Sequence, residues 1–284
     1  MKIIVTGSKG QLGTDVVAEL QKNGIDAIGA DLPELDITDS ETVESFIYKS
    51  KADAVIHCAA FTNVDIAETD RDVCRRVNVE GTLNIARSCA NHDIKMLYIS
   101  TDYVFSGEGN VPFETDSETK PCNFYGESKL AGEKAVTENC KKYFIVRISW
   151  VFGENGRNFV KTMLRLSKER EEITVVNDQI GSPTYTKDLS KLLCNMIVSE
   201  KYGIYHATNE GFCSWAEFAS KIMELSDAAT RIIPVSSDEY KSVAKRPSNS
   251  RLSKTSLDSG EFERLPHWQN ALERYLENTS DIIN

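Results

Sequence analysis

The chain has 284 residues, 40% of them hydrophobic and 27% charged, which is typical of a globular protein with either one large α/β domain or one domain and a smaller lobe. Its formal net charge of −10 argues against a surface for nucleic acid or an anionic membrane. Seven scattered cysteines, no apolar stretch approaching about 18 residues and a chain that opens directly on a strand together predict a cytoplasmic protein with buried thiols.

A run of β-branched residues opens the chain and leads directly into a glycine loop. Residues 2–6 predict a buried strand, and residues 14–22 have helical periodicity. Between them, glycines occur at the spacing of a dinucleotide fingerprint, which allows a tight turn and close approach of the backbone to a pyrophosphate. The amides at the helix start would face the phosphates. We therefore predict that this loop binds a dinucleotide through Gly7, Gly10, Gln11, Leu12 and Gly13.

The second predicted strand, residues 25–30, ends at an acidic residue. Asp31 stands 18 residues after Gly13, close to the spacing at which a carboxylate binds the adenosine ribose. Asp31 would repel a 2′-phosphate, which favours NADH, but Lys9 is placed to offset that repulsion, so both cofactors stay open. A predicted helix over 39–50 follows, and just before it Asp36 and Ile37 are placed to flank the adenine.

A third predicted strand over 54–58 runs into small residues, Ala59 and Ala60, followed by Phe61. Small side chains there would let the backbone lie against a cofactor. They would serve equally well for tight packing of the strand against a helix, and the sequence leaves both interpretations open. Residues 66–91 predict one long or kinked helix, with Asn78 placed to bond to a neighbouring strand.

The fourth predicted strand, residues 95–99, ends at Ile99 and continues into a segment rich in hydroxyl, carboxylate and aromatic groups. Open α/β sheets bind ligands at the carboxyl ends of their parallel strands. Thr101 and Asp102 are therefore candidates for the reacting site.

A fifth predicted strand over 143–149 brings Trp150 to the same edge of the sheet as Thr101. A polar loop over 107–122 precedes it and is long enough to form a rim or a lid. The alternation of strand and helix to this point predicts a Rossmann-type, doubly wound parallel sheet.

The helix after that loop carries Tyr125 and, four residues later, Lys129. This spacing puts both side chains on one helix face. A lysine ammonium favours the phenolate and would lower a tyrosine pKa, normally near 10, towards neutrality, which makes the pair a usable general acid/base. Chance alone predicts about 0.7 Tyr-x3-Lys pairs in this composition, so the pair gains its meaning only from its setting.

Beyond residue 150 the strand–helix alternation loosens. We assign residues 1–150 to a dinucleotide-binding Rossmann domain and residues 151–284 mainly to a smaller C-terminal substrate-binding lobe. Strands from about 173–207 are expected to return to the sheet. The sequence has neither internal repeats nor a low-complexity linker, which predicts that the two parts share an interface.

The motifs gain weight when they are taken together. The glycine loop, Asp31, Ser100-Thr101 and Tyr125-x3-Lys129 resemble an extended short-chain dehydrogenase/reductase. Six longer blocks resemble the dTDP-4-dehydrorhamnose reductase family in particular: Ser-Thr-Asp-Tyr-Val-Phe (100–105), Tyr-Gly-Glu-Ser-Lys-Leu-Ala-Gly-Glu (125–133), Arg-Ile-Ser-Trp-Val-Phe-Gly (147–153), Asn-Phe-Val-Lys-Thr-Met (158–163), Asp-Gln-Ile-Gly-Ser-Pro-Thr (178–184) and Arg-Pro-Ser-Asn-Ser (246–250).

This resemblance implies reduction of dTDP-4-dehydro-β-L-rhamnose to dTDP-β-L-rhamnose with NADPH or NADH, the last step in making an activated sugar for surface polysaccharides. It implies that Tyr125 donates a proton to the developing alkoxide and that Lys129 binds the nicotinamide ribose and keeps the tyrosine acidic. Thr101 would polarise the carbonyl group. By the same resemblance, the sugar contacts Thr101, Asp102 and Trp150.

Two other functions are compatible with a cofactor-binding fold of this kind. A sugar-nucleotide dehydratase or epimerase of the same superfamily would regenerate its cofactor. Dehydratases resembling this chain carry Thr-Asp-Glu after the fourth strand, whereas Tyr103 stands in the third position here, so the base for elimination is missing. A non-catalytic subunit resembling the regulatory subunit of methionine adenosyltransferase is disfavoured because Thr101, Tyr125 and Lys129 are all present.

The resemblance also bears on whether this chain binds a metal ion and forms a dimer. Family members have been described as dependent on Mg²⁺, with acidic residues at a dimer contact, and Asp15 is acidic here. No second acid could be matched in the corresponding region, around Lys187 and Asp188, so we predict no metal site. A homodimer is implied by analogy alone.

Overall fold

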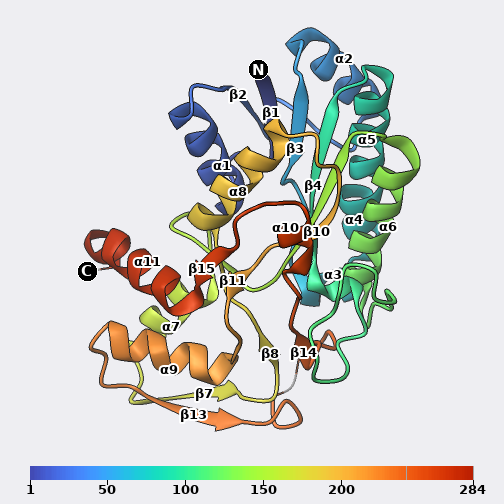
Figure 1. Ribbon diagram of the computed structural model, residues 1–284. Helices are drawn as coiled ribbons and strands as arrows, with labels where there is room; N and C mark the ends of the chain where they lie inside the picture. Colours follow the sequence, from blue (N-terminus) through green and yellow to red (C-terminus); the bar gives the residue numbers. More distant parts are fainter. Residues whose placement is uncertain (241, 284) are drawn as a thin grey trace.

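A parallel sheet of six strands lies at the centre of the computed structural model, which describes residues 1–240 and 242–283 (Figure 1). Its strand order is β10-β5-β4-β3-β1-β2, and every neighbouring pair is parallel. Short runs rich in valine and isoleucine suit strands that are buried on both faces. The predicted doubly wound sheet is confirmed, with strands β1 (Lys2–Thr6), β2 (Asp26–Ala30), β3 (Ala54–His57), β4 (Lys95–Thr101), β5 (Tyr143–Ile148) and β10 (Gly203–His206).

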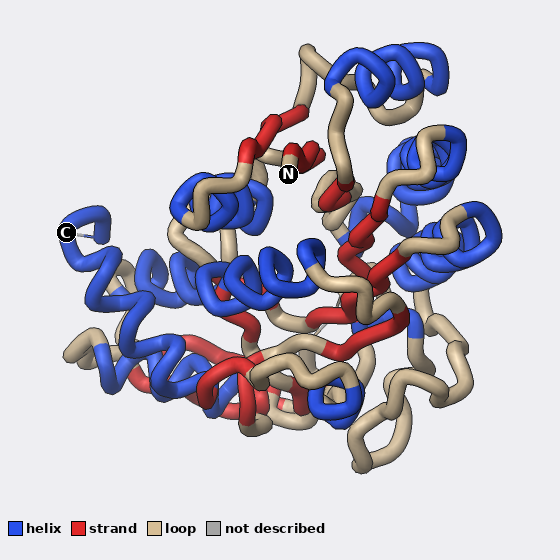
Figure 2. Tube along the Cα trace, turned by 45° about the horizontal axis from the view of Figure 1, so that its top comes forward, coloured by secondary structure: helices blue, strands red, loops and turns tan. Residues whose placement is uncertain are grey.

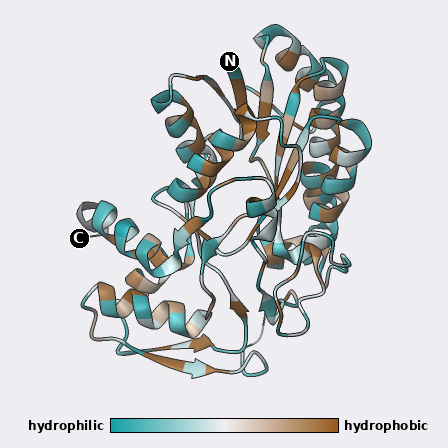
Figure 3. Ribbon diagram, in the orientation of Figure 1, coloured by the Kyte–Doolittle hydropathy of each residue, from teal (hydrophilic) through white to brown (hydrophobic). Residues whose placement is uncertain are grey.

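Helices cover both faces of this sheet. Side chains alternate along each strand, so each strand has apolar side chains on both faces that must be buried. In β1, Ile3 and Val5 pack into the apolar cluster beneath one helical layer, whereas Ile4 packs into the cluster beneath the other. Figure 2 shows these two layers from a tilted direction, and Figure 3 shows the apolar strands between them. The layers consist of α1 (Gln11–Lys22) and α8 (Thr186–Val198) on one side, and α2 (Ser40–Ser50), α5 (Thr82–Asn91) and α6 (Phe124–Asn139) on the other.

The helix expected over 66–91 is kinked. It is divided into α3 (Val64–Thr69), α4 (Arg71–Arg75), a π-helical turn η1 (Arg76–Gly81) and α5. Asn78 in the π turn is buried, and its side chain accepts a hydrogen bond from the Phe61 amide at 2.8 Å and donates one to the Phe61 carbonyl at 3.0 Å. Asn78 was expected to bond to a neighbouring strand, and it bonds instead to the loop that follows β3, since β3 ends at His57.

The C-terminal part forms a smaller lobe below the sheet (Figure 1). An aromatic cluster that includes Phe152, Phe218 and Tyr275 forms its core. The lobe is built mainly from α7 (Phe159–Ser167), β7 (Glu172–Val176), α9 (Trp215–Leu225), β13 (Arg231–Val235) and α11 (Trp268–Ile283). Shorter elements complete the chain: η2 (Asp102–Val104), β6 (Val151–Phe152), β8 (Ile180–Gly181), β9 (Thr184–Tyr185), β11 (Asn209–Glu210), β12 (Cys213–Ser214), β14 (Asn249–Ser250), α10 (Thr255–Ser259) and β15 (Leu265–His267).

Of the two strands expected to return to the main sheet, β10 does so and pairs with β5. The other, β7, pairs with β13 in the small lobe instead. Ile173 and Val175 are buried while Glu172 and Thr174 are exposed, which suits a sheet covered on one face only. Among the described residues, no helix is long and apolar enough to cross a bilayer.

Candidate active site

A cleft of about 800 Å³ opens at the carboxyl ends of β1, β3, β4 and β5. The glycine loop lies at one end, and the segment that follows β4 lies at the other. Residues from the N-terminal sheet and residues after β5 line the cleft, as expected for a ligand site at this edge of an open α/β sheet. The predicted site residues that line the cleft are Gly7, Gly10, Gln11, Leu12, Gly13, Asp31, Asp36, Ile37, Ala59, Ala60, Ile99, Thr101, Asp102, Tyr125, Lys129 and Trp150.

Of the expected residues, all of which the structure describes, Phe61 alone does not line the cleft. Its backbone is bound to Asn78 instead. This bond fixes the end of the segment in which Ala59 and Ala60 lie. Contact between Phe61 and the cofactor stays a prediction.

The glycine loop has the shape that a pyrophosphate needs. Gly7 has φ +64°, and a side chain on it would place Cβ 2.7 Å from the Ala59 amide nitrogen. A Cβ on Gly13 would collide with the Gly7 carbonyl oxygen. The N-cap of α1 is Gly10, which has no side chain to bond to the first-turn amides. Those amides remain available to a bound anion, so the loop fits a dinucleotide.

Asp31 is held at the end of β2 by two backbone amides. Its carboxylate accepts hydrogen bonds from Lys9 N at 3.1 Å and from Leu32 N at 2.9 Å. The Lys9 ammonium turns towards Glu34, with Nζ 3.2 Å from Oε2. Two carboxylates therefore stand near the expected ribose position, and the lysine is already paired with one of them.

Tyr125 lies in the first turn of α6, which the side chain of Asn123 caps by accepting a 2.8 Å hydrogen bond from Gly126 N. The Tyr125 ring meets the Tyr103 ring edge-on, with 5.5 Å between centroids. Burial raises the pKa of Tyr125 above its usual value, and Asp102 and Tyr103 add to that effect, whereas a hydrogen bond with Thr101 opposes it. Tyr125 is therefore protonated at neutral pH.

Lys129 is 3% exposed, and its Nζ lies 4.1 Å from the centroid of the Tyr98 ring. Burial lowers the pKa of Lys129 to about 7, although Glu133 opposes the shift. The prediction that Lys129 lowers the pKa of Tyr125 is wrong, because burial raises the pKa of Tyr125 instead. A protonated tyrosine nevertheless suits a donor to an alkoxide, which is a far stronger base than a phenolate.

Thr101 and Asp102 share a hydrogen bond at the end of β4. Thr101 Oγ1 donates to Asp102 Oδ1 at 3.0 Å and accepts from Tyr103 N at 3.3 Å. Asp102 Oδ2 is buried without a hydrogen-bond partner among the described residues. Burial raises the pKa of Asp102 to about 6, against the hydrogen bonds with Ser250 and Thr101 that lower it. Asp102 therefore lines the cleft beside Thr101 as a buried carboxyl group.

Because folding raises the pKa of Asp102 from 3.8 to about 6, its ionisation destabilises the fold. The penalty is absent below about pH 4 and complete above about pH 6, where it reaches at most about 3 kcal/mol. We expect the Asp102→Asn variant to have a higher melting temperature than the wild type, by a margin that grows as the pH rises from about 4 to 7. The variant should also have a lower turnover rate than the wild type. Thermal melts of both proteins across this range measure the difference, and a constant difference would contradict a buried, titrating Asp102.

Trp150, which directly follows Ser149 at the end of β5, also lines the cleft. Its backbone has φ +49°, an uncommon value for a non-glycine residue that persists only where the surroundings hold it. The indole stacks on Trp215 of the small lobe with 3.7 Å between ring centroids, and a Cβ on Gly181 would approach it to 2.7 Å. This packing holds a flat aromatic surface against the cleft, which suits the apolar face of a sugar or nicotinamide ring.

The sequence did not single out Arg157, which also lines the cleft. Its neighbour Gly156 lies over the start of α1, where a Cβ would be 3.4 Å from that of Gln11. Gln11 Nε2 donates to the Val151 carbonyl at 3.2 Å, and Asn158 Nδ2 donates to Gln11 Oε1 at 2.9 Å. These bonds hold residues 151–158 against the glycine loop, so the Arg157 side chain lies at the cleft beside that loop. No local pattern could have revealed it, because the contact spans about half the chain.

The acidic residues near the expected metal region do not fit a cation site. Both carboxylate oxygens of Asp188 accept from Arg274, at 2.8 and 2.6 Å, and Oδ2 also accepts from Asn209. Lys187 pairs with Glu154 beside Asp15. Within residues 1–240 and 242–283, no group of three or more His, Cys, Asp or Glu side chains could hold a metal ion.

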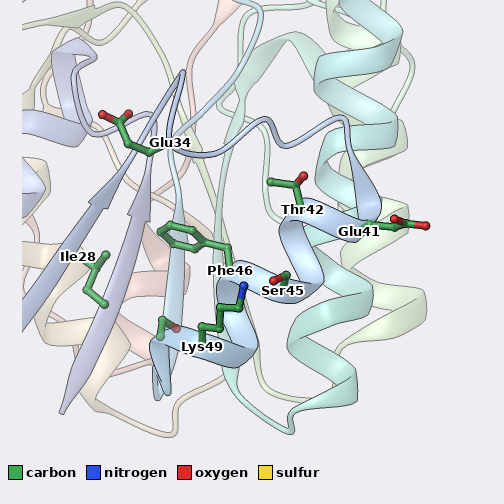
Figure 4. Close-up of a pocket in the computed structure, with 8 residues that line it drawn as sticks. Ile28, Glu34, Glu41, Thr42, Ser45, Phe46 and Lys49 are labelled. Carbon is green, nitrogen blue, oxygen red and sulfur yellow. The ribbon is translucent and has the colours of Figure 1, made fainter.

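A second groove, of about 640 Å³, lies at the outer edge of the sheet between β2 and α2 (Figure 4). The Phe46 ring lies between the helix and the edge strand, with Lys49 and Ser45 beside it (Figure 4). None of the site residues predicted from the sequence lines this groove. The predicted site residues gather instead in the cleft at the carboxyl ends of the strands.

The chain was compared with known proteins and solved structures. It matches the family described as "RmlD substrate binding domain" over residues 1–280. The spore coat polysaccharide biosynthesis protein SpsK of Bacillus subtilis is 39% identical over 283 residues, covering 100% of this chain and 99% of that protein. The dTDP-4-dehydrorhamnose reductase of Aggregatibacter actinomycetemcomitans is 38% identical over 284 residues, covering 95% of this chain and 97% of the relative.

Among solved structures, the dTDP-4-dehydrorhamnose reductase of Bacillus anthracis in complex with NADP superimposes with a TM-score of 0.96 and 43% identity. The match covers 98% of this chain and 100% of that one.

Proposed function

This chain belongs to the RmlD family of dTDP-4-dehydrorhamnose reductases, and on that premise we propose that it reduces dTDP-4-dehydro-β-L-rhamnose to dTDP-β-L-rhamnose. The observation that carries the proposal is that Thr101, Tyr125 and Lys129 line the same cleft as a dinucleotide-shaped glycine loop. A nicotinamide cofactor, when bound, supplies the hydride for the keto carbon. The product is a precursor for polysaccharide synthesis.

The protein's own groups account for the rest of the reaction. Tyr125 is protonated and can give its proton to the oxygen that becomes the alcohol. The Thr101 hydroxyl can turn from Asp102 Oδ1 to the keto oxygen and stabilise the charge that develops there. Lys129, which lines the cleft and has a pKa near 7, would hold the ribose hydroxyls of a bound cofactor. Asp102 and the stacked Trp150, which both line the cleft, can orient the sugar.

The test is to incubate the purified chain with dTDP-4-dehydro-L-rhamnose and either NADPH or NADH, following nicotinamide absorbance and product identity. Oxidation of the cofactor with formation of dTDP-rhamnose is expected. If neither cofactor is oxidised, the chain is not this reductase. A dehydratase or epimerase would change the sugar without net oxidation of the nicotinamide, so the same assay separates those alternatives.

We propose that the chain accepts both NADPH and NADH. Asp31 and Glu34 disfavour a 2′-phosphate, while Lys9 can exchange its contact with Glu34 for one with that phosphate. We place the reaction in the cytoplasm, since all seven cysteines are free thiols. A homodimer stays a prediction.

Asp31→Ala should raise the ratio of kcat/KM for NADPH to that for NADH by about 10-fold, because it removes a charge of the same sign as the phosphate. Steady-state kinetics with each cofactor measure this ratio. The matched control is Asp26→Ala, which removes an exposed carboxylate at the other end of β2, where it pairs with Lys2 at 3.6 Å. An unchanged ratio in Asp31→Ala would remove Asp31 from the ribose site.

A further inference from the structure

A buried ion pair joins the helix of the reacting tyrosine to the sheet. The Arg147 guanidinium in β5 donates to Glu133 in α6 through Nε to Oε1 and Nη2 to Oε2, each at 2.8 Å. The two side chains are 3% and 4% exposed. Such a two-pronged bond fixes both the distance and the orientation of its partners.

Glu133 also reaches the strand that carries Thr101. Its Oε1 accepts a hydrogen bond from Ser100 Oγ at 2.5 Å, and Ser100 directly precedes Thr101 in β4. On α6, Glu133 lies one turn after Lys129 on the same helix face. One carboxylate therefore connects the helix that bears Tyr125 and Lys129 to the strand that bears Thr101.

Arg147 holds the loop that leads into the same helix. Its Nη1 donates to the Thr115 carbonyl at 3.0 Å and lies 3.4 Å from His206 Nε2. The guanidinium also lies 4.9 Å from the centroid of the Phe105 ring. The loop over 107–122, predicted as a rim or a lid, is thus anchored at Thr115 to the sheet.

We propose that Glu133 and Arg147 are a positioning pair, which fixes Tyr125 and Lys129 relative to Thr101 for hydride reduction. A buried ion pair is seldom more stabilising than a well-packed apolar pair, so stability alone does not account for it. Misplacing a reacting group by about 1 Å can cost about 10²-fold in rate. The inference rests on the proposed function and adds to it two residues that do not line the cleft.

The test is the double variant Glu133→Gln/Arg147→Met, which removes both charges of the pair together. We expect it to fold and bind NADPH with a Kd within about 3-fold of the wild type, with KM for the sugar changed as little, while kcat falls by about 30- to 100-fold. A purely structural role would lower stability without this separation of kcat from KM. A kcat within about 3-fold of the wild type would overturn the proposal.

A matched control comes from the lobe, where Arg274 donates two hydrogen bonds to Asp188, itself 4% exposed. The variant Asp188→Asn/Arg274→Met should keep its kcat, and an equal loss there would overturn a specific role for the first pair. If the first double variant does not fold, Glu133→Asp and Arg147→Lys replace it. These keep the charges but change the reach, so a lowered kcat at unchanged KM supports the proposal and an unchanged kcat overturns it.

The wild type is assayed in parallel with these variants. A wild-type chain that does not reduce the sugar contradicts the proposed function and any role in that reaction. An active wild type with unaffected variants overturns the positioning role alone.

Discussion

Replacing Tyr125 by phenylalanine should lower kcat by about 10³-fold, because the reaction would lose its proton donor while hydride delivery stays intact. The ring would remain in place, since its edge-on contact with Tyr103 needs no hydroxyl group. NADPH binding should therefore change by less than about 3-fold. Single-turnover measurements with saturating cofactor, alongside a fluorescence titration of NADPH, give both quantities.

Tyr103→Phe is the matched control for this prediction. Tyr103 lines the same cleft, and burial raises its pKa as it does that of Tyr125, but Tyr103 precedes α6 and stands outside the Tyr-x3-Lys pair. Its loss of a hydroxyl should cost less than about 10-fold in kcat. If Tyr125→Phe kept its turnover, or if Tyr103→Phe lost as much, the proton donor would have been misassigned.

The second large effect is expected at Thr101. Thr101→Val keeps the shape of the side chain but removes the hydroxyl, and should lower kcat by about 10²-fold with little change in KM for the sugar. The hydroxyl also accepts a hydrogen bond from Tyr103 N. Its removal should therefore also lower the free energy of unfolding by about 1 kcal/mol.

Thr101→Ser separates these contributions, because it retains a hydroxyl for both the carbonyl and the Tyr103 amide. We expect serine to restore most of the activity. The kinetics of both variants are measured with melting curves as the check on folding. A valine variant within about 3-fold of the wild-type kcat would show that another group polarises the carbonyl.

Most of the main sheet could be predicted from the sequence because its signals are local. Apolar runs of β-branched residues, each followed by a helical period, define strands such as β1 and β3 without reference to the rest of the chain. The partner of β7 could not be predicted in this way, since strand pairing in the lobe depends on tertiary packing. The partner strand β13 contains Pro234, which weakens its signal as a strand.

The residues of the candidate site likewise fall into those found in local motifs and those found only through long-range contacts. Gly13, Thr101 and Tyr125 stand in contiguous motifs, and the cleft unites them. Arg157 and the pair of Glu133 with Arg147 act through contacts between distant elements, which spacing alone does not encode. The pKa of Tyr125 was predicted in the wrong direction because burial, which raises it, cannot be derived from a four-residue spacing.

The proposed reaction transfers a hydride from a nicotinamide to C4 of a nucleotide-linked keto sugar. To test it, the chain is supplied with dTDP-4-dehydro-L-rhamnose and with NADPH that carries deuterium at the transferred position of its nicotinamide, and the label is located in the product by NMR. We expect deuterium at C4 of dTDP-rhamnose, in an amount equal to that of the oxidised cofactor. A product without deuterium at C4, or cofactor that stays reduced while the sugar changes, would rule out this hydride transfer.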